Sequence, residues 1–321
     1  MPKHLIPLTI LGGSDRRASR LPPSGRDQQP LTGCKGADLR IDGRPLAAII
    51  AKRFTETGLF GPIYVAGPAD AYRGMAHIEA VFDTDSGFGG NIQAGILGMR
   101  ERHPNGVLAM TTCDILPRVA EVKLAAEEFW DHAPSDLWFP MISVPEDDEA
   151  LGSSAWKPRY RIPDTNGKSA GSTPVLPSHL AIFDPEAMRL RFLFRLLDIA
   201  YATRNRPVLY RRSYFVRQMM FSIFYRDLMN LLSLRLPTLA WDTLAHAPKA
   251  ALKLSEGRLT RPELEDALRR LFVQRKHRKT HPDRKTRMPI LNGLSLARDI
   301  DTLEEAIALG VVKTSLLDSE E

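Results

Sequence analysis

The chain has 321 residues, of which 43% are hydrophobic and 26% are charged, with a formal net charge of +6. These values are ordinary for a globular protein, and the two cysteines, Cys34 and Cys113, argue against a disulfide framework and fit a reducing compartment. No signal-peptide pattern and no uninterrupted apolar run of about 18 residues is present, so we expect a cytoplasmic protein without a membrane span.

The first element is an apolar run from Leu8 to Leu11 that ends in Gly12 and Gly13. This pattern predicts a buried strand followed by a tight loop, where glycines let backbone N–H groups approach a base or a phosphate. The cationic residues that follow it are Arg16, Arg17, Arg20, Arg26 and Lys35. Residues 43–46 then lead into a helix-period run through Ile49, Ile50 and Phe54. The order of glycine loop, cations and helix is typical of a nucleoside triphosphate site.

Short apolar runs at 62–68, 80–82 and 106–114 predict further strands, with a helix over 91–99 that has Asn91 as its N-cap. Strands and helices alternating at this spacing predict right-handed βαβ units in a largely parallel, doubly wound sheet. Ligands bind beyond the carboxyl ends of such strands, where both Gly12–Gly13 and Asp114 would lie.

The second half of the chain has longer helical patterns and more basic segments than the first. We expect a helix over 121–132, a strand over 137–144, a loop over 156–173, a strand over 180–183, long Arg-rich helices over 186–236, a helix over 261–274, a basic loop over 276–285, a resumed sheet pattern over 293–302 and a helix over 303–309. Thr260 and Glu263 predict a capping box for the helix at 261. The domain organisation expected from this is an α/β domain over 1–185 plus 291–321, with a helical, basic insertion or subdomain over 186–290.

Three carboxylates occupy predicted strand ends: Asp114 in one place, Asp299 and Asp301 in another. Carboxylates aimed at one crevice are suited to hold Mg²⁺ against a triphosphate, because the ion prefers oxygen ligands. A capping or turn role for each aspartate is the alternative, and Asp301 before Thr302 fits an N-cap as well.

These residues resemble the MobA-like nucleotidyltransferases, the group of molybdenum-cofactor guanylyltransferases and sugar-nucleotide pyrophosphorylases. The resemblance is carried by Gly12-Gly13, Arg20, Lys35, Gly43-Arg44-Pro45-Leu46, Thr112-Cys113-Asp114-Ile115-Leu116-Pro117 and Asp299-Ile300-Asp301-Thr302-Leu303-Glu304-Glu305. It implies a sheet of the glycosyltransferase-A type and Mg²⁺-dependent transfer of a nucleoside monophosphate from an NTP to a phosphorylated or hydroxyl small-molecule acceptor. The chain departs from the family in its longer first loop, in Leu303, where a proline is frequent, and in Glu305, which replaces an aspartate, so the resemblance does not name the base or the acceptor.

The resemblance also implies residue roles. Leu11, Gly12 and Gly13 would hold the nucleotide, and Asn91 and Gly95 would border its base. Arg20 and Lys35 would bind the phosphates. Asp114 and Asp301 would be the metal ligands, with Asp299 as a helper.

Other functions are also compatible with these residues. A glycosyltransferase-A enzyme using a sugar nucleotide would share the carboxylates, and a non-catalytic nucleotide-sensing or membrane-surface protein would keep the fold. The Arg-rich segment 189–226 either covers the sheet, forms a homo-oligomer interface or makes peripheral contact with an anionic membrane. We expect no nucleic-acid partner, because no reader motif is present, and no zinc site at His277 and His281, which share a basic, proline-broken segment.

Overall fold

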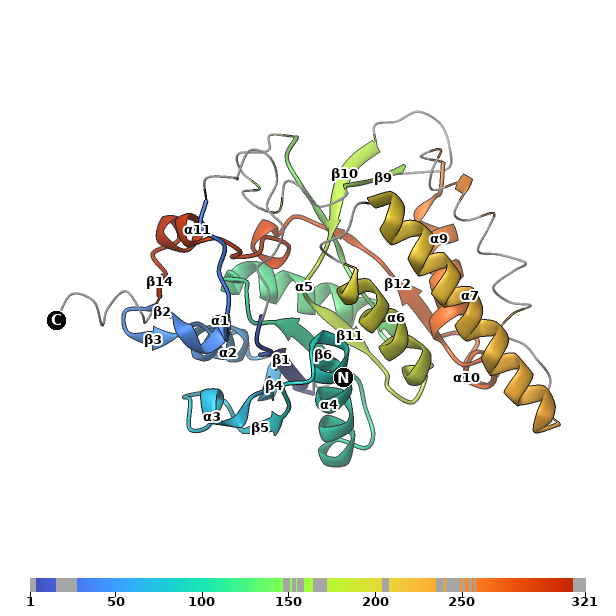
Figure 1. The fold of residues 1–321 in the computed structure, drawn as a ribbon, viewed down its shortest axis with the longest axis horizontal. Helices are drawn as coiled ribbons and strands as arrows, with labels where there is room; N and C mark the ends of the chain where they lie inside the picture. Colours follow the sequence, from blue (N-terminus) through green and yellow to red (C-terminus); the bar gives the residue numbers. More distant parts are fainter. Residues whose placement is uncertain are drawn as a thin grey trace.

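The computed structural model describes residues 4–15, 28–146, 151, 154, 159–163, 172–203, 208–234, 240, 249, 252–253, 256 and 258–313. Its centre is a seven-stranded sheet in the order β12-β7-β11-β6-β1-β4-β5 (Figure 1). The strands are β1 (Ile6–Leu11), β4 (Phe60–Gly67), β5 (Ala80–Asp83), β6 (Leu108–Thr112), β7 (Ser135–Trp138), β11 (Ala181–Phe183) and β12 (Lys285–Arg287).

The sheet is mostly parallel. β1 pairs in parallel with both β4 and β6, β4 with β5, and β7 with β12, while β11 runs antiparallel between β6 and β7. The carboxyl ends of β1 and β6 therefore meet at one edge of the sheet, as do the residues that lead into β11. The predicted mostly parallel α/β sheet is confirmed.

Alternating side chains of β1 show that helices cover both faces. Ile6, Leu8 and Ile10 belong to one apolar core with the buried faces of α2 (Leu46–Glu56) and α5 (Val119–Asp131). Leu11 belongs to a second core with α4 (Phe88–Arg102) and α6 (Leu190–Ala202). This alternation follows from the two-residue period of a strand, and it makes the sheet doubly wound as predicted.

Two smaller sheets flank the central one. One has the order β13-β8-β10-β9 and the other β14-β2-β3. Their strands are β2 (Leu39–Ile41), β3 (Arg44–Pro45), β8 (Met141–Ser143), β9 (Tyr160–Pro163), β10 (Ser172–Pro177), β13 (Ile290–Leu291) and β14 (Val312–Lys313). The single strand predicted over 137–144 is therefore wrong, because β7 and β8 belong to different sheets and Phe139 and Pro140 separate them.

Four further expectations on local structure need correction. The predicted loop over 156–173 includes β9 and the start of β10. The predicted sheet pattern over 293–302 contains a 3₁₀ helix, η3 (Leu294–Leu296), and no strand among those residues, all of which the structure describes. The basic loop over 276–285 is helical in its first part, as α10 (Arg275–Thr280). Asn91 lies within α4, whose N-cap is Gly87 at φ +85°.

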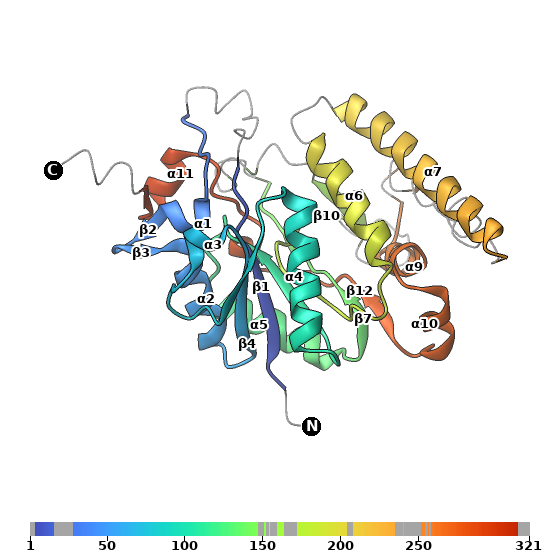
Figure 2. The ribbon, with the colours of Figure 1, turned by 60° about the horizontal axis from the view of Figure 1, so that its bottom comes forward.

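The Arg-rich segment forms α6 and α7 (Val208–Leu232), followed by α9 (Arg261–Phe272) with the predicted capping box. The remaining short helices are α1 (Lys35–Asp38), α3 (Ala69–Tyr72) and α11 (Leu303–Ala308). α6 lies beside α4, and α7 lies at the outer side of α6 in both views (Figures 1 and 2). The subdomain predicted over 186–290 stays a prediction, although β12 lies inside that range and pairs with β7 of the central sheet.

No helix in the described ranges is both long and apolar enough to cross a membrane.

Candidate functional site

Lys35 lies at the centre of a group of carboxylates at the carboxyl edge of the sheet. It begins the short helix α1, and its side chain is only 3% exposed. Its Nζ lies 2.7 Å from Asp301 Oδ1, 3.4 Å from Asp15 Oδ2 and 3.9 Å from Asp114 Oδ2. One ammonium group thus faces three carboxylates from three separate segments of the chain.

The pKa values of this group reflect its excess of negative charge. Burial by itself lowers the pKa of Lys35, but the carboxylates of Asp301, Asp114 and Asp15 outweigh burial and raise that pKa above its ordinary value. Burial raises the pKa of Asp301; Lys35 opposes this, and Asp299 and Asp114 add to it. Lys35 therefore stays protonated, and among the described side chains its single ammonium group faces three carboxylates.

A second set of side chains adjoins the first. The ligand atoms of Asp114, His179 and Asp299 all lie within 4.8 Å of one another. His179 Nε2 forms an ion pair with Asp299 Oδ1, and His179 Nδ1 lies 3.0 Å from Thr112 Oγ1. Asp114 follows β6 and His179 precedes β11, so the antiparallel direction of β11 brings both residues to the same edge.

Backbone hydrogen bonds hold the late motif of residues 299–305 against this edge. The Ile300 amide donates to the Asp114 carbonyl at 2.7 Å, and the Leu31 amide donates to the Asp301 carbonyl at 2.8 Å. The Glu305 carboxylate accepts from the amides of Asp301 and Thr302, at 3.0 and 3.2 Å. This capping box at the start of α11 fixes the backbone of Asp301 while its side chain binds Lys35.

The predicted glycine turn follows β1. Its two glycines are also required by the packing of neighbouring side chains. A Cβ at Gly12 would lie 2.7 Å from the ring of Tyr72, and a Cβ at Gly13 would lie 1.9 Å from Asn91 Nδ2. The Gly12 amide donates to the Ala66 carbonyl at 2.8 Å. That amide is therefore already bonded within the protein, contrary to the expectation that it faces a ligand.

The other residues predicted for the nucleotide lie close to this turn. Leu11 is buried in the core shared with α4. Asn91 is buried, and its Oδ1 accepts from Thr84 Oγ1 at 3.1 Å. A Cβ at Gly95 would lie 3.0 Å from Thr9 Cγ2, so Gly95 allows α4 to approach β1. Arg20, predicted to bind phosphates, lies outside the described residues.

The structure thus brings Lys35, Asp114, Asp299 and Asp301 into one cluster, next to the turn at Gly12 and Gly13. Two members of the neighbourhood were missed from the sequence. Asp15 is the second residue after the glycines, and His179 comes just before an apolar strand. His179 lies at the carboxyl edge of the parallel strands because it leads into β11, which is antiparallel to them. The sequence shows a polar residue before an apolar strand, but it does not show the direction of that strand.

The donor set fits a divalent cation. Asp114 Oδ1 is buried and has no hydrogen-bond partner among the described residues, which is costly for a carboxylate unless a cation binds it. Asp114 and Asp299 supply the oxygen ligands that Mg²⁺ prefers. The imidazole of His179 is less typical of Mg²⁺, but His179 is bonded to Asp299 and to Thr112, as a residue that orients a ligand would be.

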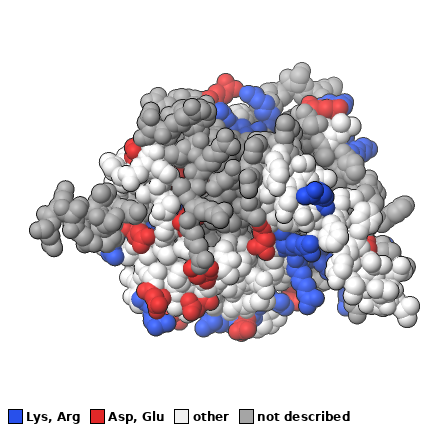
Figure 3. All heavy atoms as spheres, in the orientation of Figure 1, with Lys and Arg blue, Asp and Glu red and all other residues white. Residues whose placement is uncertain are grey.

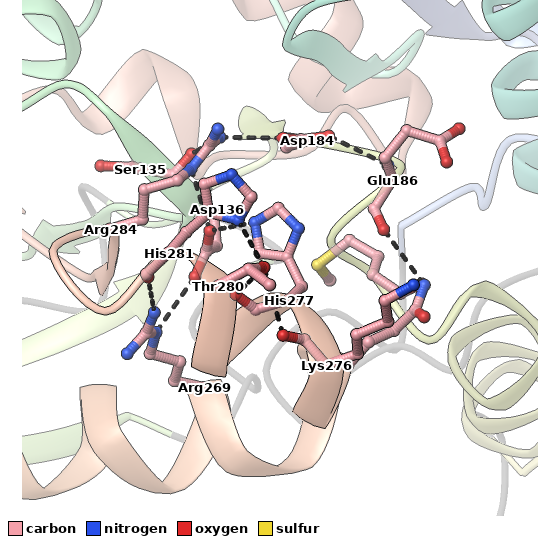
Figure 4. Close-up of polar contacts among 12 residues, drawn as sticks. Ser135, Asp136, Asp184, Glu186, Arg269, Lys276, His277, Thr280, His281 and Arg284 are labelled. Carbon is pink, nitrogen blue, oxygen red and sulfur yellow. Dashed lines mark hydrogen bonds and ion pairs between the residues drawn. The ribbon is translucent and has the colours of Figure 1, made fainter.

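A second buried ionic cluster, shown in Figure 4, lies at the amino-terminal ends of the parallel strands and has a different composition. The fully buried Asp136 lies 3.0 Å from Arg269 Nε, 3.1 Å from His277 Nε2 and 3.0 Å from Arg284 Nε. Arg284 also pairs with Asp184 at 2.9 Å. The cluster joins α9, α10 and the segment before β12 to the start of β7.

The solved structures to which this chain is similar share little sequence identity with it. No protein-family model matches the chain, and no curated protein is similar to it in sequence. Among solved structures, it is similar to CMP:2-keto-3-deoxy-manno-octonic acid synthetase complexed with CTP, with 12% identity over 60% of this chain and 77% of that one and a TM-score of 0.37.

HddC from Yersinia pseudotuberculosis complexed with GMP-PN is 15% identical over 59% of this chain and 79% of that one, with a TM-score of 0.37. The 4-diphosphocytidyl-2C-methyl-D-erythritol synthase from Anaerococcus prevotii DSM 20548 is 9% identical over 98% of this chain and 99% of that one, with a TM-score of 0.39. These TM-scores are too low to assign a family or an activity, so the function has to be argued from the site.

Proposed function

We propose that the protein is a Mg²⁺-dependent nucleotidyltransferase of the MobA-like type, which transfers a nucleoside monophosphate from an NTP to a small-molecule acceptor and releases pyrophosphate. The observation that carries this proposal is the cluster of Asp114, Asp299 and His179, whose ligand atoms lie within 4.8 Å of one another. It lies at the carboxyl edge of a mostly parallel sheet, which is where such sheets bind their ligands.

In the proposed reaction, an oxygen of the acceptor forms a bond to the α-phosphorus. The bond from that phosphorus to the oxygen bridging the α- and β-phosphates breaks, and pyrophosphate leaves with the electron pair. A phosphate acceptor needs no base, because its oxygen is already deprotonated near neutral pH. A bound Mg²⁺ would neutralise negative charge on the α-phosphate and the leaving group.

The residues of the chain would then have separate tasks. Asp114 and Asp299 would hold the cation, and His179 would orient Asp299 through their ion pair. Lys35 is buried and paired with Asp301, so we assign it the positioning of Asp301 and Asp114 in place of direct phosphate binding. Arg20 remains our candidate for the phosphates. Asn91, buried against Gly13, would fix the turn that borders the nucleotide.

The first experiment measures pyrophosphate release with Mg²⁺ and each of the four NTPs, against a panel of phosphosugars and phospho-alcohols. We expect one NTP and one acceptor to support turnover in the wild type. Asp114→Asn should lower kcat by about a hundredfold to a thousandfold, because it removes a charged ligand of the cation that stabilises the transition state.

Asp83→Asn is the matched control. Asp83 ends β5 at the same edge, but its carboxylate accepts from the Ala69 amide and belongs to neither cluster. Its substitution should leave turnover within about twofold of the wild type. Equal turnover in wild type and Asp114→Asn would contradict the assignment. Hydrolysis or transfer from a sugar nucleotide, with release of a nucleoside diphosphate, would favour the glycosyltransferase.

A further inference from the structure

A cavity of about 690 Å³ lies between α4, α6 and α7, and most of the charges on its walls are positive. This volume is typical of small-molecule sites. The arginines that line it are Arg100, Arg189, Arg191, Arg195 and Arg226, with Glu186 and Asp198 as the acidic residues of the described lining. The lining therefore carries an excess of three positive charges, and Figure 3 shows Lys and Arg side chains gathered near α4 and α6.

Two of the five arginines hold the walls of the cavity together. Arg100 of α4 forms an ion pair with Glu186, which precedes α6. Arg189 is buried, and its Nη1 donates to the carbonyls of Arg270 and Leu271 at 3.1 and 3.2 Å. These contacts fix the segment before α6 against α4 and the end of α9.

The other three arginines face the cavity without such contacts. Arg191, Arg195 and Arg226 form no ion pair within the described part of the chain. The remaining carboxylate, Asp198, lies at the start of α4, because a Cβ at Gly89 would lie 1.8 Å from its Oδ1. Like charges that share one cavity repel one another, and an anion bound between them would remove that repulsion.

One wall of the cavity is apolar. Met188 and Phe194 belong to the core that α6 shares with α4, and both are buried, so packing holds this wall in place. Leu97 of α4 lies on the same cavity and is 42% exposed. A ligand with both an anionic part and an organic part would therefore find a partner for each.

We propose that this cavity binds an organic polyphosphate of nucleotide size, with its phosphates on Arg191, Arg195 and Arg226 and its organic part against Leu97 and Phe194. The planar guanidinium group matches the geometry of phosphate oxygens and can donate two parallel hydrogen bonds to them. Adjacent phosphates bring several negative charges to one place, as the excess of positive charge in the lining requires, whereas a carboxylate brings one.

The cavity is separate from the candidate metal site. Ile92 and Ile96 of α4 are buried in the core beside the sheet, whereas Leu97 and Arg100 line the cavity on another side of the helix. None of the described lining residues belongs to the metal site or to the group around Lys35. The inference therefore does not depend on the proposed reaction.

The test is isothermal titration calorimetry of the full chain with ATP and, separately, with inorganic triphosphate, in buffer with EDTA to keep divalent cations away from the carboxyl edge. We expect ATP to bind, and inorganic triphosphate to bind more weakly because it lacks an organic part to pack on Phe194. Arg195→Gln and Arg226→Gln should each raise the Kd for ATP by about tenfold to a hundredfold, because each removes a charge-assisted hydrogen bond to phosphate.

Arg217→Gln is the matched control. Arg217 is an exposed arginine of the same helix as Arg226, lies 5.6 Å from the ring centre of Tyr214 and does not line the cavity. Its substitution removes the same charge and should leave the Kd within about twofold of the wild type, because salt screens exposed charges at a distance. Thermal unfolding without ligand checks the fold: Arg226→Gln should be no less stable than the wild type, since it removes one of several like charges.

Three outcomes would overturn the proposal. The first is a wild type that binds neither probe. The second is a folded Arg226→Gln variant that binds ATP as the wild type does, since ATP would then bind elsewhere. The third is an equal loss of binding in Arg217→Gln, which would mean that net charge alone attracts the probes. Equal affinity for ATP and inorganic triphosphate would overturn the assignment of an organic ligand.

Discussion

The two buried ionic clusters of this protein differ in their balance of charge. Around Asp136, the carboxylates of Asp136 and Asp184 are matched by the guanidinium groups of Arg269 and Arg284. Around Lys35, one ammonium faces the carboxylates of Asp15, Asp114 and Asp301. Among the side chains that the structure describes, the charges of the first cluster are matched, whereas the second has three carboxylates for one ammonium group.

The difference separates a structural cluster from a binding site. Burying charges is costly, and the cost is offset when every charge has a partner, as in the Asp136 cluster. A cluster that keeps an excess of one sign, with Asp114 Oδ1 left without a hydrogen bond, is expected where a ligand of the opposite sign completes it.

The largest effect should come from removing the centre of the Asp136 cluster. Asp136→Asn would leave Arg269 and Arg284 partly buried without their central carboxylate. We expect the free energy of unfolding to fall by about 3–5 kcal/mol, as for other broken buried ion pairs. Urea denaturation measures this. Asp131→Asn, at an exposed carboxylate at the end of α5, should change it by less than about 0.5 kcal/mol. A loss that small for Asp136→Asn would mean that the cluster does not stabilise the fold.

The Lys35 cluster should respond to a cation. Mg²⁺ at a hundred times its Kd should stabilise the wild type by about 2.7 kcal/mol, because it binds the folded state alone. Asp114→Asn should lose most of that gain. Without Mg²⁺, the same variant should be no less stable than the wild type, since it removes one of several like charges. Thermal unfolding with and without Mg²⁺ measures both quantities, and a variant that keeps the full Mg²⁺ effect would contradict the metal assignment.

Cys113 offers the smallest and most local test. Burial raises the pKa of Cys113 to about 12, and the neighbouring Asp114 adds to the rise while Lys35 opposes it. The thiolate is the reactive form, so alkylation of the native protein should be slow and should speed up about tenfold per pH unit between pH 8 and pH 10. Mass spectrometry of iodoacetamide-treated protein measures this rate.

The two clusters should affect that rate differently. Asp136→Asn should speed labelling of Cys113, because the destabilised fold opens more often. Asp114→Asn should leave the rate near that of the wild type, because burial is the largest cause of the raised pKa. A rate that levels off near pH 9 in the native protein would show that labelling proceeds through opened states, in which the thiol has its ordinary pKa of about 8.5.

Much of the fold could be predicted from the sequence, because apolar periodicity reports which face of an element is buried. The runs at 8–11, 62–68, 80–82 and 106–114 contain strands of the central sheet, and the predicted capping box at Thr260 starts α9. The N-cap of α11 is Thr302 and not Asp301, the alternative that the sequence offered. The strand predicted over 293–302 was wrong because an apolar pattern does not distinguish a strand from a buried turn with a 3₁₀ helix.

The site was predictable in its carboxylates and not in its partners. Asp114, Asp299 and Asp301 could be proposed because polar residues at the ends of buried segments collect at one edge of a parallel sheet. The pairing of Asp301 with Lys35 and of Asp299 with His179 could not, because both depend on contacts between segments more than a hundred residues apart.

The sequence by itself determined which segments are buried, where α9 and α11 begin and which residues can carry charge at the sheet edge, since these are local properties of the chain. The tertiary structure alone decided that β11 runs against its neighbours and brings His179 to Asp114 and Asp299. It also decided that α7 packs by Met219 and Ile223 and leaves its aromatic side exposed. Both outcomes depend on which distant segments pair, and this is settled only when the whole core packs.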